Sequence, residues 1–285
     1  MPGVATANRN RRMRALAGLL LWLPLGAAAQ GMQSPAQWYI NQQIYSTRVF
    51  NGVIANSMLD ATRGKPGAGQ GANGGGDAGA AAPPPPPRDV TRFDPRSASL
   101  APARLAARDG GTPRDQEQAR QRYESFVALY SQVARKDGFP ANDLAYAYEY
   151  YVVNAYHIWH DLLDLPTDRD PYLRAARDGF ERIELAARKR QQQVAMSEEQ
   201  AIYRQFRERL GTSPEIQRMS DAEKQEAAEM LAISYGISYE AYMRAIDTGD
   251  DALREEARRV ARTGLEKMLG RPVERIRIGY GGLEP

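Results

Sequence analysis

The stretch from Asn142 to Asp164 constrains the fold more than any other part of the chain. Its sequence is NDLAYAYEYYVVNAYHIWHDLLD. At about 100° per residue, most of its aliphatic residues gather with Tyr151 and Trp159 on one broad half of a helix. The first turn favours a helix, because Asn142 is a good N-cap and Asp143 adds negative charge where the helix dipole stabilises it. We therefore predict a central helix that needs partner helices over about half of its circumference.

The other half of this helix carries the only two histidines of the chain, His157 and His160. Asp161 follows His157 by four residues, and Asp164 follows His160 by four residues. Imidazole and carboxylate groups on adjacent turns could share a divalent metal, or a carboxylate could orient a histidine for base catalysis. Metal signatures are usually completed by a further ligand at a recognisable spacing, and the sequence has none. A solvated polar face with ordinary His–Asp contacts is the interpretation we favour.

Other polar and aromatic residues of the central stretch give weaker signals. Glu149 lies on the same arc as His160, but eleven residues of helix separate them by about 16 Å, so they cannot serve one small centre. Tyr146, Tyr150 and Tyr156 could line a pocket, although aromatic residues at helical spacing more often belong to a core. The sequence therefore predicts no catalytic residue, no metal site and no cofactor.

The first 29 residues have the pattern of a secretory signal peptide. Arginines at positions 9, 11, 12 and 14 precede a short apolar run from Ala15 to Leu25, and Ala27-Ala28-Ala29 offers small residues for cleavage before Gln30. The apolar run is shorter than the ~20 residues that a spanning helix needs. We expect cleavage near Ala29/Gln30 and a periplasmic or extracellular protein. An uncleaved anchor and the twin-arginine route are the alternatives.

Charge and cysteine content exclude several classes of protein. The chain has 38 basic and 35 acidic residues, a formal net charge of +3, and no cysteine. Removing the signal peptide takes away four arginines, which leaves 34 basic against 35 acidic residues, so we expect no nucleic-acid partner. The lack of cysteine excludes disulfides and thiol chemistry, and an exported protein must then rely on a sizeable core. No later apolar run is long enough for a transmembrane helix after signal cleavage.

Composition divides the remaining chain into five parts. Residues 30–61 form an N-terminal amphipathic segment, with apolar residues at helical spacing between Tyr45 and Met58. This segment could pack on the main domain, or it could be a tethered anchor that docks on a partner. Residues 62–90 are a disordered linker rich in glycine and alanine that ends in a polyproline run. A bridging segment (91–111), a helical domain (112–279) and a short tail (280–285) follow.

Capping signals and apolar periodicity divide the helical domain into helices. We predict an all-α fold, a compact bundle of about five to six helices with a short extended C-terminal tail. Gly236, in the middle of the longest helix, is expected where another helix approaches closely, and the central helix is one candidate. The predicted helices, with their signals, are Arg114–Asp137 after the Thr112 cap and Pro113, the central helix, Asp170–Gln193, Ser197–Leu210 with a Ser197/Gln200 capping box, Asp221–Asp247 with a Ser220/Glu223 capping box, and Asp250–Leu269.

Two blocks of sequence resemble a known family. FPANDLAYAYEYYVVNAY (Phe139 to Tyr156) and MSDAEKQEAAEMLAIS (Met219 to Ser234) are similar to blocks of an uncharacterised family of exported bacterial proteins, a domain of unknown function. TRFDPRSASLAPARLAA (Thr91 to Ala107) resembles the lead-in of that family. The resemblance spans Thr91 to Ile278, and the chain departs from it around Ser197 to Leu210 and in its two histidines. It implies export and a helical fold but brings no activity.

Two functional hypotheses follow from these observations. The first is a non-enzymatic exported module that binds a partner or serves a structural role, with an envelope or extracellular protein as a possible partner. The second is a small metal-dependent hydrolase or metal-binding protein centred on His157, His160, Asp161 and Asp164. The first is the one we favour, because the candidate ligands lack a completing member.

Overall fold

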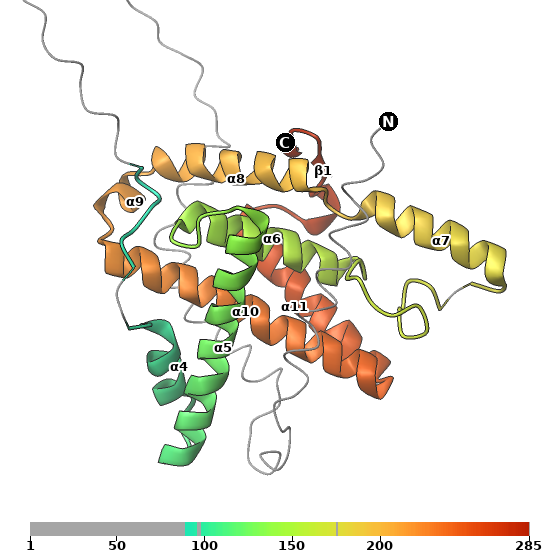
Figure 1. Ribbon diagram of the computed structural model, residues 1–285, viewed down its shortest axis with the longest axis horizontal. Helices are drawn as coiled ribbons and strands as arrows, with labels where there is room; N and C mark the ends of the chain where they lie inside the picture. Colours follow the sequence, from blue (N-terminus) through green and yellow to red (C-terminus); the bar gives the residue numbers. More distant parts are fainter. Residues whose placement is uncertain (1–88, 96–97, 175, 285) are drawn as a thin grey trace, which may run out of the picture.

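A computed structural model of the chain describes residues 89–95, 98–174 and 176–284. The predicted signal peptide (1–29), the segment 30–61 and all but the last two residues of the predicted linker lie outside the described residues. The described residues are mostly helical, which confirms the predicted all-α class (Figure 1), and none of their helices has the length and hydropathy needed to cross a membrane. The elements are α4 (Ala101–Asp109), α5 (Pro113–Asp137), α6 (Leu144–Trp159), α7 (Gly179–Gln192), α8 (Met196–Gly211), α9 (Pro214–Arg218), α10 (Asp221–Thr248), α11 (Asp251–Leu269), the 3-10 turn η1 (Val273–Arg275), β1 (Ile278–Gly279) and β2 (Gly282–Leu283).

Helix α6 lies at the centre of the described fold. It packs against α8, α10 and α11, and Figure 1 shows it between α8 on one side and α10 on the other. The main hydrophobic core forms around α6 and draws buried residues from all three of these partners. The sequence therefore predicted correctly that later helices cover the central one.

The burial of α6 is more complete than its amphipathic pattern indicates. Only three of its residues escape full burial, and two members of the predicted polar arc, Glu149 and His157, are inside the protein. The cause is aromatic packing, because Tyr146 and Tyr150 contact Tyr130 of α5 with ring centroids 5.3 and 5.1 Å away. The prediction of a half-exposed helix is therefore wrong, since tyrosines carry the core around to the side that helical periodicity assigns to water.

Residues 91–93 fix the start of α6. The amide of Phe93 donates to the carbonyl of Asn142 at 3.1 Å, and the side chain of Asn142 donates to the carbonyl of Phe93 at 2.9 Å. Asp143 is the N-cap, because its carboxylate accepts the amide hydrogen of the second helical residue at 2.9 Å. The predicted Asn142 cap is wrong by one residue, because Asn142 holds the lead-in segment instead.

The other predicted caps have mixed outcomes. Thr112 caps α5 and Ser220 caps α10, each in a reciprocal capping box with the acidic residue three positions later, which confirms both helix starts. The predicted box at Ser197 is wrong, because α8 begins one residue earlier. There Glu198 accepts the amide hydrogen of Ala195 at 2.7 Å, so the second half of the box exists without the usual serine.

Helix α4 extends the packed body beyond the predicted boundary at residue 112. The segment 91–111, which the composition marks as a bridge, contains α4, and Leu105 is buried in a cluster completed by α5 and α10. On α10, Glu229 accepts hydrogen bonds from two amides at the start of α4, each at 2.8 Å. The described helical body therefore begins near residue 91.

Two glycines let pairs of helices approach closely. A Cβ placed on Gly236 of α10 would overlap the ring of Phe126 on α5, and one placed on Gly264 of α11 would overlap the hydroxyl of Tyr151 on α6. Gly236 thus allows a close approach, as predicted, but its partner is α5 rather than the central helix. The close contact with the central helix belongs to Gly264.

The C-terminal tail is a small hairpin held against α8. Strands β1 and β2 pair antiparallel. The Gln205 side chain accepts the amide hydrogen of Leu283 at 2.8 Å and donates to the carbonyls of Gly281 and Leu283 at 3.0 and 3.1 Å. Leu283 is buried in the main core, so the tail packs against the helices and the packed body reaches further than residue 279.

Candidate functional site

His157 is the most buried of the four residues predicted as a possible metal or catalytic site. It lies on the last turn of α6, and its Nε2 accepts a hydrogen bond from the amide of Val194 at 3.1 Å. Val194 lies in the connection between α7 and α8. A ring nitrogen that accepts a hydrogen bond has its lone pair engaged, so this nitrogen is not available to a metal. His157 therefore ties the α7–α8 connection to the central helix.

Asp161 turns the chain just after α6. Its φ of 55° lies in the left-handed region, which aspartate tolerates better than most residues. Its Oδ1 accepts a hydrogen bond from the hydroxyl of Tyr242 at 2.6 Å, and its Oδ2 lies 3.5 Å from Nε of Arg258. The same Nε donates to the carbonyl of Trp159 at 2.9 Å. Asp161 thus links the end of α6 to the helices α10 and α11.

His160 occupies the C-cap of α6 and is partly buried. Its ring lies 4.4 Å from the ring of Tyr156. Burial lowers the pKa of His160, the nearby Arg258 lowers it further, and Asp161 opposes both effects. Burial and the Asp161 carboxylate raise the pKa of Tyr242, so its hydroxyl keeps the proton that it donates to Asp161. The cluster at the end of α6 is therefore built around a neutral imidazole at neutral pH.

The four candidate residues do not form one centre. His157 contacts the α7–α8 connection, whereas Asp161 contacts α10 and α11. Asp164 lies beyond the end of α6 and is partly buried. In the described part of the chain, no group of three or more histidine, aspartate and glutamate side chains is placed to hold a metal ion. The predicted solvated face is also wrong at His157, because the α7–α8 connection covers it.

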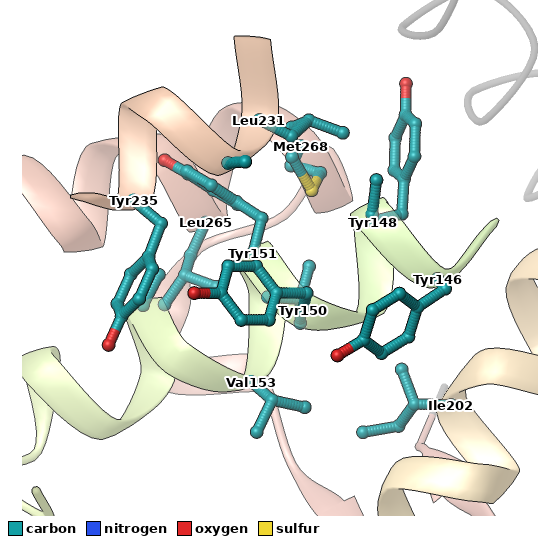
Figure 2. Packing of buried hydrophobic residues seen from close by; sticks show 14 of the residues in the cluster. Tyr146, Tyr148, Tyr150, Tyr151, Val153, Ile202, Leu231, Tyr235, Leu265 and Met268 are labelled. Atoms are coloured by element: carbon teal, nitrogen blue, oxygen red, sulfur yellow. The ribbon is translucent and has the colours of Figure 1, made fainter. Parts of the chain in front are cut away.

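Of the tyrosines that could have lined a pocket, Tyr146 and Tyr150 are part of the core, and Tyr156 is partly buried and packs against it. Figure 2 shows Tyr146 and Tyr150 among apolar side chains of α6, α8, α10 and α11. Tyr150 meets Tyr235 edge to face, with ring centroids 5.1 Å apart. Burial raises the pKa of Tyr146 and of Tyr150 far above the ordinary tyrosine value. These two rings pack in the core, and neither hydroxyl is poised for proton transfer near neutral pH.

A buried ion pair that the sequence does not indicate anchors α7. The Lys189 ammonium contacts the Asp170 carboxylate and donates to the carbonyl of Leu163 at 2.6 Å. The basic and amide-rich run 188–193 has the pattern of a solvated helix end, but this interpretation is wrong at Lys189, because only about 5% of this residue is exposed. Spacing cannot identify the pair, since the chain between the two residues makes turns before it enters α7.

The rest of α7 projects from the body with apolar side chains in water. The predicted helix from Asp170 is wrong in its first part, because turns occupy the region before residue 179. Phe180 and Ile183 are 72% and 70% exposed, and Ala187 continues the same face one turn later. We call these three residues the α7 stripe. At about 100° per residue, Lys189 lies on the opposite side of the helix from Phe180, so the stripe faces away from the body.

Comparison with known proteins identifies one family. Residues 9–172 and 187–285 match a family described as "Family of unknown function (DUF6683)". The match begins well before Thr91, where the resemblance was expected to start, and it includes 197–210, where a departure was expected. The residues between the matched ranges, 173–186, carry the first half of α7 with Phe180 and Ile183.

The matched ranges fit the architecture, because they include the central helix and all its packing partners. No curated protein and no solved structure matches the chain. The two matched ranges cover most of its 285 residues. The chain therefore belongs to the DUF6683 family, a family of unknown function.

Proposed function

We propose that this chain is an exported helical module that acts by binding through the α7 stripe rather than by catalysis. The observation that carries the proposal is the exposure of Phe180 and Ile183 on a helix whose only buried residue is Lys189. Helices shorter than about 12–15 residues are marginal in water without a packed face. Helix α7 has 14 residues and exposes its apolar face to water. A bound partner would therefore stabilise this helix by covering that face.

The polar residues at the end of α6 support the same proposal. His157 accepts the amide of Val194, and Asp161 accepts the hydroxyl of Tyr242. These contacts engage one ring nitrogen of His157 and one carboxylate oxygen of Asp161 in holding elements of the fold together. The hydrolase alternative has no observation of comparable weight in its favour.

Export is supported by the N-terminal sequence. Arginines at positions 9, 11, 12 and 14, the apolar run Ala15–Leu25 and the alanines 27–29 have the order of a cleaved secretory signal. We expect N-terminal sequencing of the protein recovered from its native cells to begin near Gln30. Recovery of a chain with an intact Met1 would contradict export by this route.

Substitution of the stripe tests the binding role. Phe180→Asp and Ile183→Asp together should remove the chain from any larger assembly that it forms in native extracts, measured as apparent size by gel filtration. Gln118→Asp on the exposed side of α5 is the matched control and should leave the size unchanged. Equal circular dichroism spectra should accompany both results. A wild-type chain that elutes as a monomer in the extract, or an assembly that both variants retain, would argue against a binding role for the stripe.

A further inference from the structure

We propose that the occupant of the α7 stripe is the chain's own segment 34–60, which folds back across the linker and covers Phe180, Ile183 and Ala187. The inference rests on the proposed function, because it names what covers that same surface when no outside partner is bound. An outside partner would then have to displace the segment.

The chemistry of the segment suits the stripe. Tyr45, Val49 and Val53 recur every four residues, which gives an apolar stripe of about 12 Å if the segment is helical. The α7 stripe from Phe180 to Ala187 is about 10 Å long on the same geometry. Two apolar stripes of similar length can pack along each other as helix faces. A second face of the segment carries Phe50, Ile54 and Met58.

The charges around the stripe favour this segment over a second copy of α7. Glu184 and Arg188 border the stripe on one side, and both are exposed. A two-fold antiparallel pairing of α7 centred on Ile183 would bring each Glu184 close to its own copy, which is unfavourable for like charges. Residues 45–58 contain a single charged residue, Arg48, so they bring no acidic group to Glu184.

The linker has the reach that this docking requires. The described chain begins at Asp89, which pairs with Arg207 towards the C-terminal end of α8, whereas α7 precedes the other end of α8. Figure 1 shows α8 between the start of the described chain and α7. The path along α8 from Arg207 to its first residue is about 17 Å, and that along α7 back to Ile183 is about 14 Å.

The length of the linker matches this span. Residues 61–88 lie between the segment and Asp89. A flexible chain of this length has a root-mean-square end-to-end distance of roughly 30 Å. Effective concentration is highest when that distance matches the span, and it then reaches the millimolar range. Even a weak contact between the segment and the stripe is therefore largely formed within one molecule.

A single introduced cysteine tests the proposal, because the full chain contains none. In Ala187→Cys, the new thiol lies on the stripe while Phe180 and Ile183 are kept. Its rate of reaction with a maleimide dye is compared with that of Gln118→Cys on α5, which is also exposed. We expect the thiol at 187 to react about ten-fold more slowly at every protein concentration. Adding Val49→Asp and Val53→Asp should restore the rate, with an unchanged circular dichroism spectrum.

Each other result overturns the proposal. Equal rates for the two thiols mean that the stripe is uncovered. Slowing that appears only as protein concentration rises means that a second copy is the occupant, and slowing that requires anionic lipid vesicles means that a membrane surface is. Slowing that survives the two aspartates means that another part of the chain covers the stripe. In all these cases the binding role itself is still judged separately, by the effect of Phe180→Asp and Ile183→Asp on assembly size in native extracts.

Discussion

Buried polar side chains join the elements of this fold, and each satisfies a group that would otherwise lack a partner. Asp143 accepts an amide hydrogen of its own helix and the hydroxyl of Tyr203 at 2.7 Å, which links α6 to α8. Glu229 holds the start of α4, and His157 holds the amide of Val194. Buried amides and carboxylates are costly when unpaired, so these contacts specify one arrangement of the helices. The sequence shows that these residues are polar, but it does not show which distant group each of them will hydrogen-bond.

The two histidines should differ sharply in their effect on stability. His157→Ala removes a buried ring and leaves the Val194 amide without its acceptor, so it should lower the free energy of unfolding by about 2–4 kcal/mol. His160→Ala, at a partly exposed cap, should lower it by less than about 1 kcal/mol. Urea unfolding followed by circular dichroism measures both. Equal small losses would show that the His157 contact contributes little.

His160 should also make stability depend on pH. Its pKa is lowered in the folded state by burial and by Arg258, so between that value and the unfolded value of about 6.5 the unfolded chain binds the proton more readily. The free energy of unfolding should therefore fall as pH drops below about 6.5. His160→Gln cannot take up this proton and should show a flatter profile in that window. Parallel profiles for the two proteins between pH 7 and pH 5 would count against the lowered pKa.

At the scale of helices, the sequence predicts what is local and misses what is tertiary. Capping residues such as Thr112 and Ser220 mark helix starts correctly, because a cap acts on amides only a few residues away. The exposure of α7 was missed, because Phe180 and Ile183 have the spacing of a core-facing stripe. Which way that stripe turns is decided by Lys189, whose partner Asp170 lies beyond a set of turns.

Gly236 should be intolerant of a methyl group. Gly236→Ala gains about 1 kcal/mol of helix propensity, but its Cβ would overlap the ring of Phe126, and such overpacking costs about 1–3 kcal/mol. We expect a net loss of stability in thermal unfolding. Gly211→Ala is the control, because a Cβ there meets open space, and it should be neutral or slightly stabilising. A Gly236→Ala protein at least as stable as the wild type would mean that α5 and α10 separate easily.

The ion pair beneath α7 should be strongly sensitive to the loss of one partner. Lys189→Ala leaves the Asp170 carboxylate buried without its cation, which should cost about 3–5 kcal/mol. Changing both residues, as Lys189→Met with Asp170→Leu, should cost much less, because no buried charge is left unpaired. Hydrogen exchange of the α7 amides should be compared with global unfolding. The comparison shows whether α7 detaches from the body before the rest of the protein unfolds. If the double variant were as unstable as Lys189→Ala, the loss of stability would come from lost packing rather than from an unpaired buried charge.

The whole molecule combines a helical body, a projecting helix and an N-terminal part outside the described residues. The predicted glycine-, alanine- and proline-rich linker lies almost wholly outside the described residues, so its boundaries stay a prediction from composition. Composition was less informative at 91–111, because Pro95 and Pro102 limit this segment to extended or short helical pieces, as the nine-residue α4 shows, and do not reveal that it packs on the body. Only the tertiary contacts of Leu105 and Glu229 show that this segment belongs to the body.

Two truncations should locate the true start of the folded body. A chain of residues 89–285 keeps Phe93, α4 and their contacts, so it should lose no more than about 1.4 kcal/mol of unfolding free energy, which is the value of a ten-fold docking equilibrium for segment 34–60. A chain of residues 112–285 loses the burial of Phe93 and Leu105, each a matter of about 1.5–3 kcal/mol. This shorter chain also lacks the two amides that donate hydrogen bonds to Glu229. It should therefore be less stable than the 89–285 chain by several kcal/mol.

Denaturant unfolding of the two purified fragments makes this comparison, and limited proteolysis of the full chain provides an independent check. The glycine and proline run lies before residue 89, so cleavage should concentrate there. The remaining fragment should begin shortly before Phe93, whose carbonyl accepts a hydrogen bond from Asn142. Cleavage at 110–112 should require unfolding, since α4 and α5 pack together on either side of those residues. If the shorter fragment were as stable as the longer one, α4 would be an appendage, and the body would begin at the Thr112 cap after all.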